Sequence, residues 1–149
     1  MSAEFEEMKL GSAVKLNELV KVQGQVKEST NLEAGQFVCN NDAGEGFAPA
    51  TTKLSETQAV FVVEHAHNYA EAEATGELPE LKHSVALYAK GVVVAQKLVG
   101  VAMTKGQKLK VSATAGKATV VDDSADIVIG SVAVDAEAAA EKVIVRIGQ

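Results

Sequence analysis

The sequence contains few residues of several types, and each shortage argues against certain classes of function. Its 149 residues include one cysteine (Cys39), one arginine (Arg146), two prolines and no tryptophan, and aromatic residues make up 4%. A lone cysteine cannot form an intrachain disulfide. Proteins that stack nucleic-acid bases use aromatic side chains and arginine, and a net charge of −6 repels phosphates. We therefore expect no nucleic-acid partner.

Long apolar runs are missing as well. No stretch approaches the roughly 18 apolar residues that a membrane helix needs. Residues 1–9 are acidic and lack the apolar region of a signal peptide. The content of 47% hydrophobic and 23% charged residues is typical of a folded globular chain. We expect one domain, made in the cytoplasm, with no membrane partner.

Short segments rich in Val, Thr and Ala alternate with glycines, and this pattern predicts a mainly β fold. Strands are expected at residues 19–26, 36–40, 47–50, 59–65, 84–88, 91–101, 108–113, 118–121, 127–134 and 142–147. Residues 1–18 are interpreted as an N-terminal arm and residues 19–149 as a single β-rich domain, either a small β-barrel or a β-sandwich. The Glu-rich stretch 68–81 is expected to be a loop or short helix. Residues 136–141 have the composition of a single helical turn.

The charges are unevenly distributed along the chain. Residues 82–117 carry seven lysines and no acidic residue, whereas residues 1–81 carry fourteen acidic residues and five lysines. Residues 118–149 carry six acidic and two basic residues. One interpretation is a basic face that contacts an acidic neighbour or a second copy, head to tail or in a ring. The favoured alternative is that the sheet interleaves distant segments and mixes the charges in space.

The histidines have the only spacing in the sequence that resembles a transition-metal site. His65 and His67 would point to the same face of a strand, because side chains alternate there. Glu64 would face the other way, and His83 would join only if folding brought it near. The favoured interpretation is an exposed pair at the end of a strand.

The remaining candidates for chemistry have weak support. Cys39 has no basic neighbour in the sequence to activate it, no Gly-x-Ser-x-Gly motif is present, and the turn at residues 40–46 lacks the Gly-Lys-Ser/Thr of a phosphate-binding loop. The acidic residues Glu71, Glu73, Glu77 and Glu80 are interpreted as a solvated loop rather than as a glycosidase site. Asp122, Asp123 and Asp126 are interpreted as a polar turn rather than as a cation site. Lys105 is interpreted as part of an ordinary turn rather than as the modified lysine of a carrier domain. We expect no enzyme activity, no cofactor, and no catalytic or metal-binding residues.

Three phrases resemble those of head decoration, or cement, proteins of tailed phages, the small β-rich proteins of the lambda decoration-protein type. The first is Leu32–Cys39, a glycine turn followed by a strand. The others are Ile127–Asp135, a strand through Gly130, and the Ala-rich turn and alternating strand of residues 138–147. The resemblance covers mainly residues 19–50 and 100–149, and the stretch 68–81 has no counterpart in it.

The resemblance implies a virion structural protein that binds the outside of an expanded capsid and bridges subunits of the major capsid protein. It further implies a homo-oligomer, with a trimer favoured, and an N-terminal arm at residues 1–17 that adds a strand to the capsid protein. The alternative function is a small metal-binding β-barrel or enzyme that uses His65 and His67. Metal analysis of the purified protein separates the two.

Overall fold

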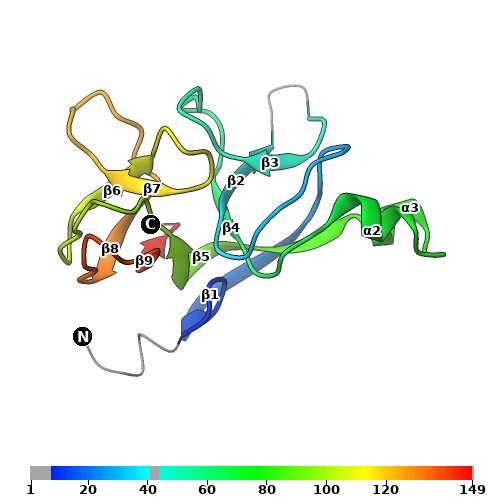
Figure 1. The fold of residues 1–149 in the computed structure, drawn as a ribbon, viewed down its shortest axis with the longest axis horizontal. Helices are drawn as coiled ribbons and strands as arrows, with labels where there is room; N and C mark the ends of the chain where they lie inside the picture. Colours follow the sequence, from blue (N-terminus) through cyan, green and yellow to red (C-terminus); the bar gives the residue numbers. More distant parts are fainter. Residues whose placement is uncertain (1–7, 41–43, 149) are drawn as a thin grey trace.

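The computed structural model describes residues 8–40 and 44–148, and within these ranges the fold is mainly β. The elements are β1 (Ala13–Gln25), β2 (Phe37–Asn40), β3 (Phe47–Pro49), β4 (Phe61–Val63), α2 (Tyr69–Glu73), α3 (Pro79–Lys82), β5 (Ser84–Gln96), β6 (Lys108–Val111), β7 (Ala118–Val120), β8 (Gly130–Val134) and β9 (Lys142–Ile147) (Figure 1).

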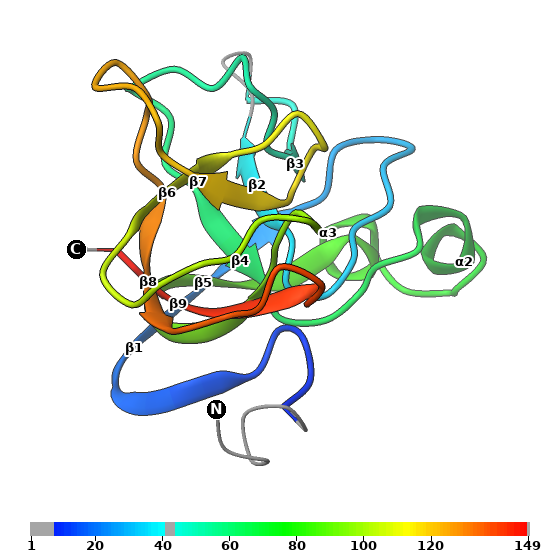
Figure 2. The same cartoon turned by 60° about the vertical axis from the view of Figure 1, so that its left-hand side comes forward.

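The strands form one sheet in the order β3-β2-β4-β5-β9-β8-β6-β7, and β1 pairs with β5 outside this path. Every named pair is antiparallel. The sheet curls around its core as a half-barrel (Figure 2). The mainly β prediction is therefore confirmed, and the sheet has the curl of a barrel without its full closure.

Strand β5 is the centre of the sheet. It pairs with β1 along most of its length, with β4 at residues 87–88 and with β9 at residues 91–96. The sequence predicted two strands here, separated near Gly91, and this separation is wrong. Gly91 has a φ of +138°, and a Cβ at this position would lie 2.8 Å from Leu19 Cδ1. The glycine lets β5 continue through a close approach to β1.

The core follows the two-residue period of β5 and β9. Val93 and Val145 face the main core, which also contains Phe37, Tyr88 and Leu109.

The alternate residues face the other side of the sheet. Val92, Val94 and Ile144 form a second cluster, against which Met8 and Leu10 pack. The beginning of the described chain therefore covers the outer face of β5 and β9.

Strand β1 begins at Ala13, whereas the sequence placed residues up to 18 in an arm. Its register with β5 shifts between Ala13 and Lys15, between Lys15 and Val20, and between Val20 and Lys21. These irregularities break the alternation that identifies a strand in a sequence. Residues 1–7 of the expected arm lie outside the described residues, and the division of the chain at residue 18 stays a prediction.

One lysine lies inside the core. Lys97 is fully buried, and its ammonium donates hydrogen bonds to the carbonyls of Leu98 (3.0 Å), Ala138 (3.2 Å) and Ala140 (2.9 Å). Burial lowers the pKa of this lysine. Residues 136–141 form a turn and not the helical turn considered from their composition. One hydrogen bond, from the N–H of Ala140 to the carbonyl of Glu137, lies within the segment, whereas its other carbonyl acceptors receive hydrogen bonds from outside it, mainly from Lys97 and Met103.

Candidate interaction surface at the helical end

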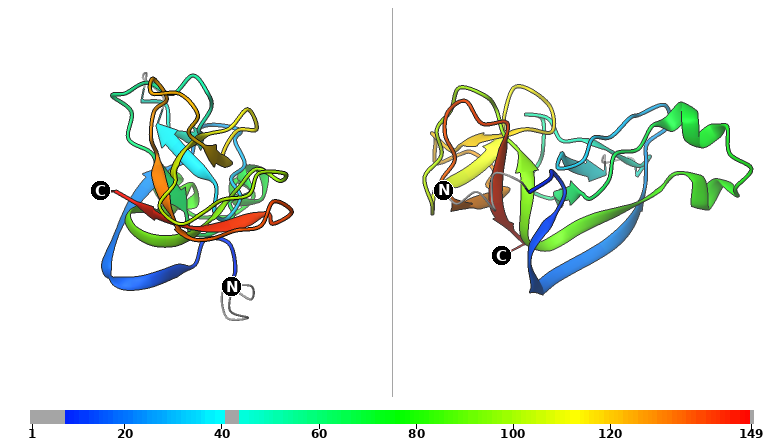
Figure 3. Two further views of the ribbon diagram at one scale, coloured as in Figure 1. Left: turned by 90° about the vertical axis from the view of Figure 1, so that its left-hand side faces the viewer. Right: turned by 60° about the horizontal axis from the view of Figure 1, so that its bottom comes forward.

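The residues between β4 and β5 project from the sheet. We call residues 67–83 the helical end; it contains α2 and α3 and lies beyond the long ribbon that β1 and β5 form (Figures 1 and 3). The predicted loop or short helix at residues 68–81 is present as these two short helices. Strand β5 leads from the helical end into the half-barrel.

The helices are short because the sequence begins and interrupts them. Asn68 caps α2, since its side chain accepts a hydrogen bond from the backbone N–H of Glu71 at 3.0 Å. Asn31 holds the same turn from outside by accepting the N–H of Tyr69 at 2.9 Å. Pro79 opens α3 at its first turn. The tip is thus built from local capping interactions.

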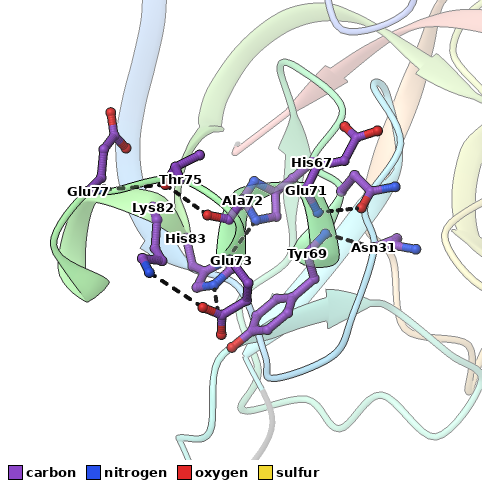
Figure 4. Close-up of polar contacts among 11 residues, drawn as sticks. Asn31, His67, Tyr69, Glu71, Ala72, Glu73, Thr75, Glu77, Lys82 and His83 are labelled. Atoms are coloured by element: carbon purple, nitrogen blue, oxygen red, sulfur yellow. Dashed lines mark hydrogen bonds and ion pairs between the residues drawn. The ribbon is translucent and has the colours of Figure 1, made fainter.

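Three rings pack together at the base of the helical end (Figure 4). His67 Nε2 lies 3.0 Å from His83 Nδ1, and the ring of Tyr69 stacks on His83 with centroids 3.7 Å apart. Glu73 Oε1 is 3.5 Å from His83 Nε2, and Glu73 also pairs with Lys82 at 3.5 Å. This cluster joins α2 and the end of α3 to the start of β5.

The structure brings His83 to His67 but leaves His65 apart. Strand β4 ends at Val63, so the expected alternation of the two sequence histidines on one strand face is absent. The His65 side chain is 84% exposed, whereas the backbone of His67 pairs with Leu32 through two hydrogen bonds of 2.9 Å. Among the residues that the structure describes, no group of three or more His, Cys, Asp or Glu side chains could hold a metal ion.

Protonation of His67 is expected to loosen the helical end. Burial lowers the pKa of His67, and the nearby His83 lowers it further. The folded state therefore favours neutral His67, and its contribution to stability is fully present above the unfolded pKa of about 6.5 and is lost as the pH falls below it. An NMR titration should give a pKa below 6.5 for His67, and His67→Gln should remove this part of the pH dependence of unfolding. An unchanged pH dependence in the variant would contradict the assignment.

A second polar cluster fixes the ribbon where it leaves the half-barrel. Lys21 Nζ and Tyr88 OH each donate to Glu64 Oε2 at 2.8 Å, which links β1, β5 and the residue after β4. Burial acts to raise the pKa of Glu64, but these hydrogen bonds outweigh it and lower the pKa. The ribbon therefore leaves the sheet at a defined angle.

The helical end exposes both large apolar and acidic side chains. The side chains of Leu78 and Leu81 are 61% and 58% exposed. Glu71, Glu77 and Glu80 are exposed nearby in the sequence. Large exposed apolar side chains with a polar surround are typical of interaction sites. The sequence analysis missed the two leucines, although they are the only large aliphatic residues of the Glu-rich stretch 68–81.

The other candidates from the sequence have structural roles. Asp126 pairs with Lys110 at 3.0 Å and accepts the backbone N–H groups of Asp122 and Asp123, so this segment is the polar turn that was predicted. Lys105 lies in a turn and donates its backbone N–H to Asp135 at 2.7 Å.

Strands β2 and β3 pair as neighbours in the chain, and the Asn40 side chain accepts the N–H of Gly46 at 3.1 Å between them. Cys39 is half-buried in β2. The ion pairs of Lys110 with Asp122 and of Lys82 with Glu73 join the lysine-rich segment to acidic ones. They favour mixing of the charges in space over one uniform basic face.

Within the described residues, no helix has the length and apolar character to cross a membrane.

Comparisons with known proteins identify the family. The model of the family described as "Structural cement protein (E217 gp24/Pam3 gp6)", a family of phage cement proteins, matches residues 9–148. No curated protein and no solved structure matches the chain significantly. The match includes all nine described strands and the whole helical end. The chain therefore belongs to the family of phage structural cement proteins.

Proposed function

We propose that this protein binds the outer surface of a phage capsid and bridges neighbouring capsid subunits without catalysing a reaction. Membership of the cement protein family carries a structural, capsid-associated role. The observation that supports bridging is the shape of the chain, which has a half-barrel at one end and the helical end at the other (Figure 3). Two separated surfaces on one molecule can contact two different subunits.

The ribbon supports this function through its length and its attachment. Residues 84–88 of β5 precede its pairing with β9 and pair with residues 21–25 of β1, which corresponds to a ribbon of about 16 Å at 3.3 Å per residue. The Glu64 cluster fixes its base. A stiff connection between two contact surfaces holds them at a fixed separation. A flexible connection would lose conformational entropy when both surfaces bind, which would weaken binding. Many such contacts on one shell add up as avidity.

Binding to empty shells tests the proposed function. Purified protein mixed with expanded capsids that lack it should co-sediment in a fixed ratio to the major capsid protein and raise the temperature at which the shells break. Lys21→Met/Glu64→Leu, which removes the cluster at the base of the ribbon, should weaken shell stabilisation more than binding. Protein that stays in the supernatant at saturating concentration would overturn the proposal.

Two finer features of the proposal need their own measurements. Native mass spectrometry of the free and the released protein tests the trimer that the family resemblance implies. Cryo-electron microscopy of decorated shells tests the outer surface as the site of binding. Density on the inner surface, or a stable monomer in both states, would correct these features.

A further inference from the structure

The apolar tip of the helical end has a complementary surface on the opposite part of the same chain. We call Leu78 and Leu81, with Glu77 and Glu80, the acidic knob. Within the described residues, neither Glu77 nor Glu80 has a cationic side chain within 4.0 Å. The knob therefore exposes two aliphatic side chains and two free negative charges.

A groove of about 500 Å³ lies between β4, β8 and the end of β9. Its apolar lining includes Phe61, Val128 and Ile129, and the charged residues at it are Lys108, Arg146 and Glu56. Val128 is 50% exposed. Lys108 is exposed and forms no ion pair within the described residues, whereas Arg146 pairs with Glu18 at 2.7 Å. The groove thus presents an exposed apolar surface that carries the positive charge of Lys108 and, among its other lining residues, the negative charge of Glu56.

The knob and the groove cannot meet within one chain. The groove includes Gly148, next to the C-terminus, and Figure 1 places the C-terminus in the half-barrel and the helices at the far end of the ribbon. The β1–β5 ribbon and the Glu64 cluster keep the two regions apart. Each surface is therefore available to another molecule.

We propose that the acidic knob of one copy of this chain docks into the groove of a second copy. Leu78 and Leu81 would cover Val128 and Phe61, and Glu80 would approach Lys108. The two surfaces in this contact, the knob and the groove, are different, so the contact is heterologous. Repeating it produces a closed ring or an open array, depending on the rotation between neighbouring copies. On a capsid, this contact would connect neighbouring cement proteins to one another.

A mixing experiment tests the contact with the protein in solution. Leu78→Ser/Leu81→Ser removes the knob, and Val128→Asp/Lys108→Glu blocks the groove. In each of the two variants, one half of the contact is destroyed, so each variant should associate with itself only weakly. A mixture retains one intact knob and one intact groove, and association should return only in the mixture. Val99→Ser, at a side chain that is 52% exposed outside both surfaces, is the control and should associate like the natural sequence.

The readout is sedimentation velocity together with NMR of one isotope-labelled variant. Each inactivated variant should bind itself at least about tenfold more weakly than the natural sequence does. The labelled knob variant, mixed with the unlabelled groove variant, should show shifts at residues 127–131. Association of the natural sequence should weaken in about 1 M salt, where the Debye length is about 3 Å.

The charge pair has a separate test. Glu80→Lys and Lys108→Glu should each weaken association, and equal amounts of the two variants should associate through the reversed pair. No association of the natural sequence at about 1 mM, or equal association of all variants, would overturn the proposal. Capsid binding is measured separately on shells, so a failure here leaves the proposed function standing.

Discussion

Lys97→Met is expected to lower the free energy of unfolding by about 2–4 kcal/mol, although it replaces a buried charge by an apolar side chain of similar size. Three carbonyls in the interior accept hydrogen bonds from this one ammonium, and two of them, from Ala138 and Ala140, lie in the same turn. A methionine at this position cannot donate a hydrogen bond, so the three carbonyl oxygens lose the hydrogen bonds that Lys97 provides. Chemical denaturation of the variant and the natural sequence measures the difference.

The control for this substitution is Lys90→Met, at an exposed position of β5, the strand that Lys97 directly follows. It should change stability by no more than about 0.5 kcal/mol. A Lys97→Met variant that is as stable as the natural sequence would show that the cost of burying the charge equals the gain from its hydrogen bonds. In that case the turn at residues 136–141 does not depend on Lys97.

Gly11→Ala is expected to cost about 3 kcal/mol or more, because two penalties coincide there. Gly11 has a φ of +81°, which side chains rarely adopt, and its added Cβ would overlap the carbonyl oxygen of Glu64. The N–H of Gly11 also donates to the carbonyl of Val94 at 2.8 Å, so the segment cannot simply move away. Displacing it would uncover the outer face of β5 and β9, where Met8 and Leu10 pack.

Gly106→Ala separates the two penalties. Gly106 has a φ of +93°, and a Cβ there would have no atom within 4 Å. This variant should therefore cost only the backbone part, about 1–2 kcal/mol. Thermal or chemical denaturation of both variants gives the packing part as their difference. Equal losses would mean that the N-terminal segment adapts without cost.

Much of the strand content could be predicted from the sequence because apolar side chains recur at every second residue in several strands. Residues 142–147 alternate clearly and form β9 at those residues. The order of strands could not be predicted, since alternation identifies a face but not a neighbour. Strand β1 was partly missed because register shifts break its pattern. Gly91 was wrongly taken as the boundary of a strand, because a glycine in a β-rich segment can mark either the end of a strand or a point where a neighbouring strand approaches closely.

The candidate surface was only partly predictable. The sequence indicated that His83 would join the histidines if folding brought it near, and it does join His67. The sequence prediction grouped His65 with His67 because it extended the strand to residue 65. In the structure, β4 ends at Val63, and His67 forms backbone hydrogen bonds with Leu32 instead of continuing the strand. Leu78 and Leu81 were recognisable as isolated apolar residues, but only the fold places them at an end of the molecule.

The central position of β5 also determines when the chain can fold. Its partners are Ala13 near one terminus and Ile147 near the other, paired with Val93 and Gly91. Strand β1 must therefore wait for about seventy further residues to be synthesised before it can pair with β5, and the pairing of β5 with β9 requires residues 142–147. Pairings so distant in sequence close large loops and fold on the scale of milliseconds to seconds. A chain truncated before β9 therefore lacks the strand that joins β5 to β8 in the sheet.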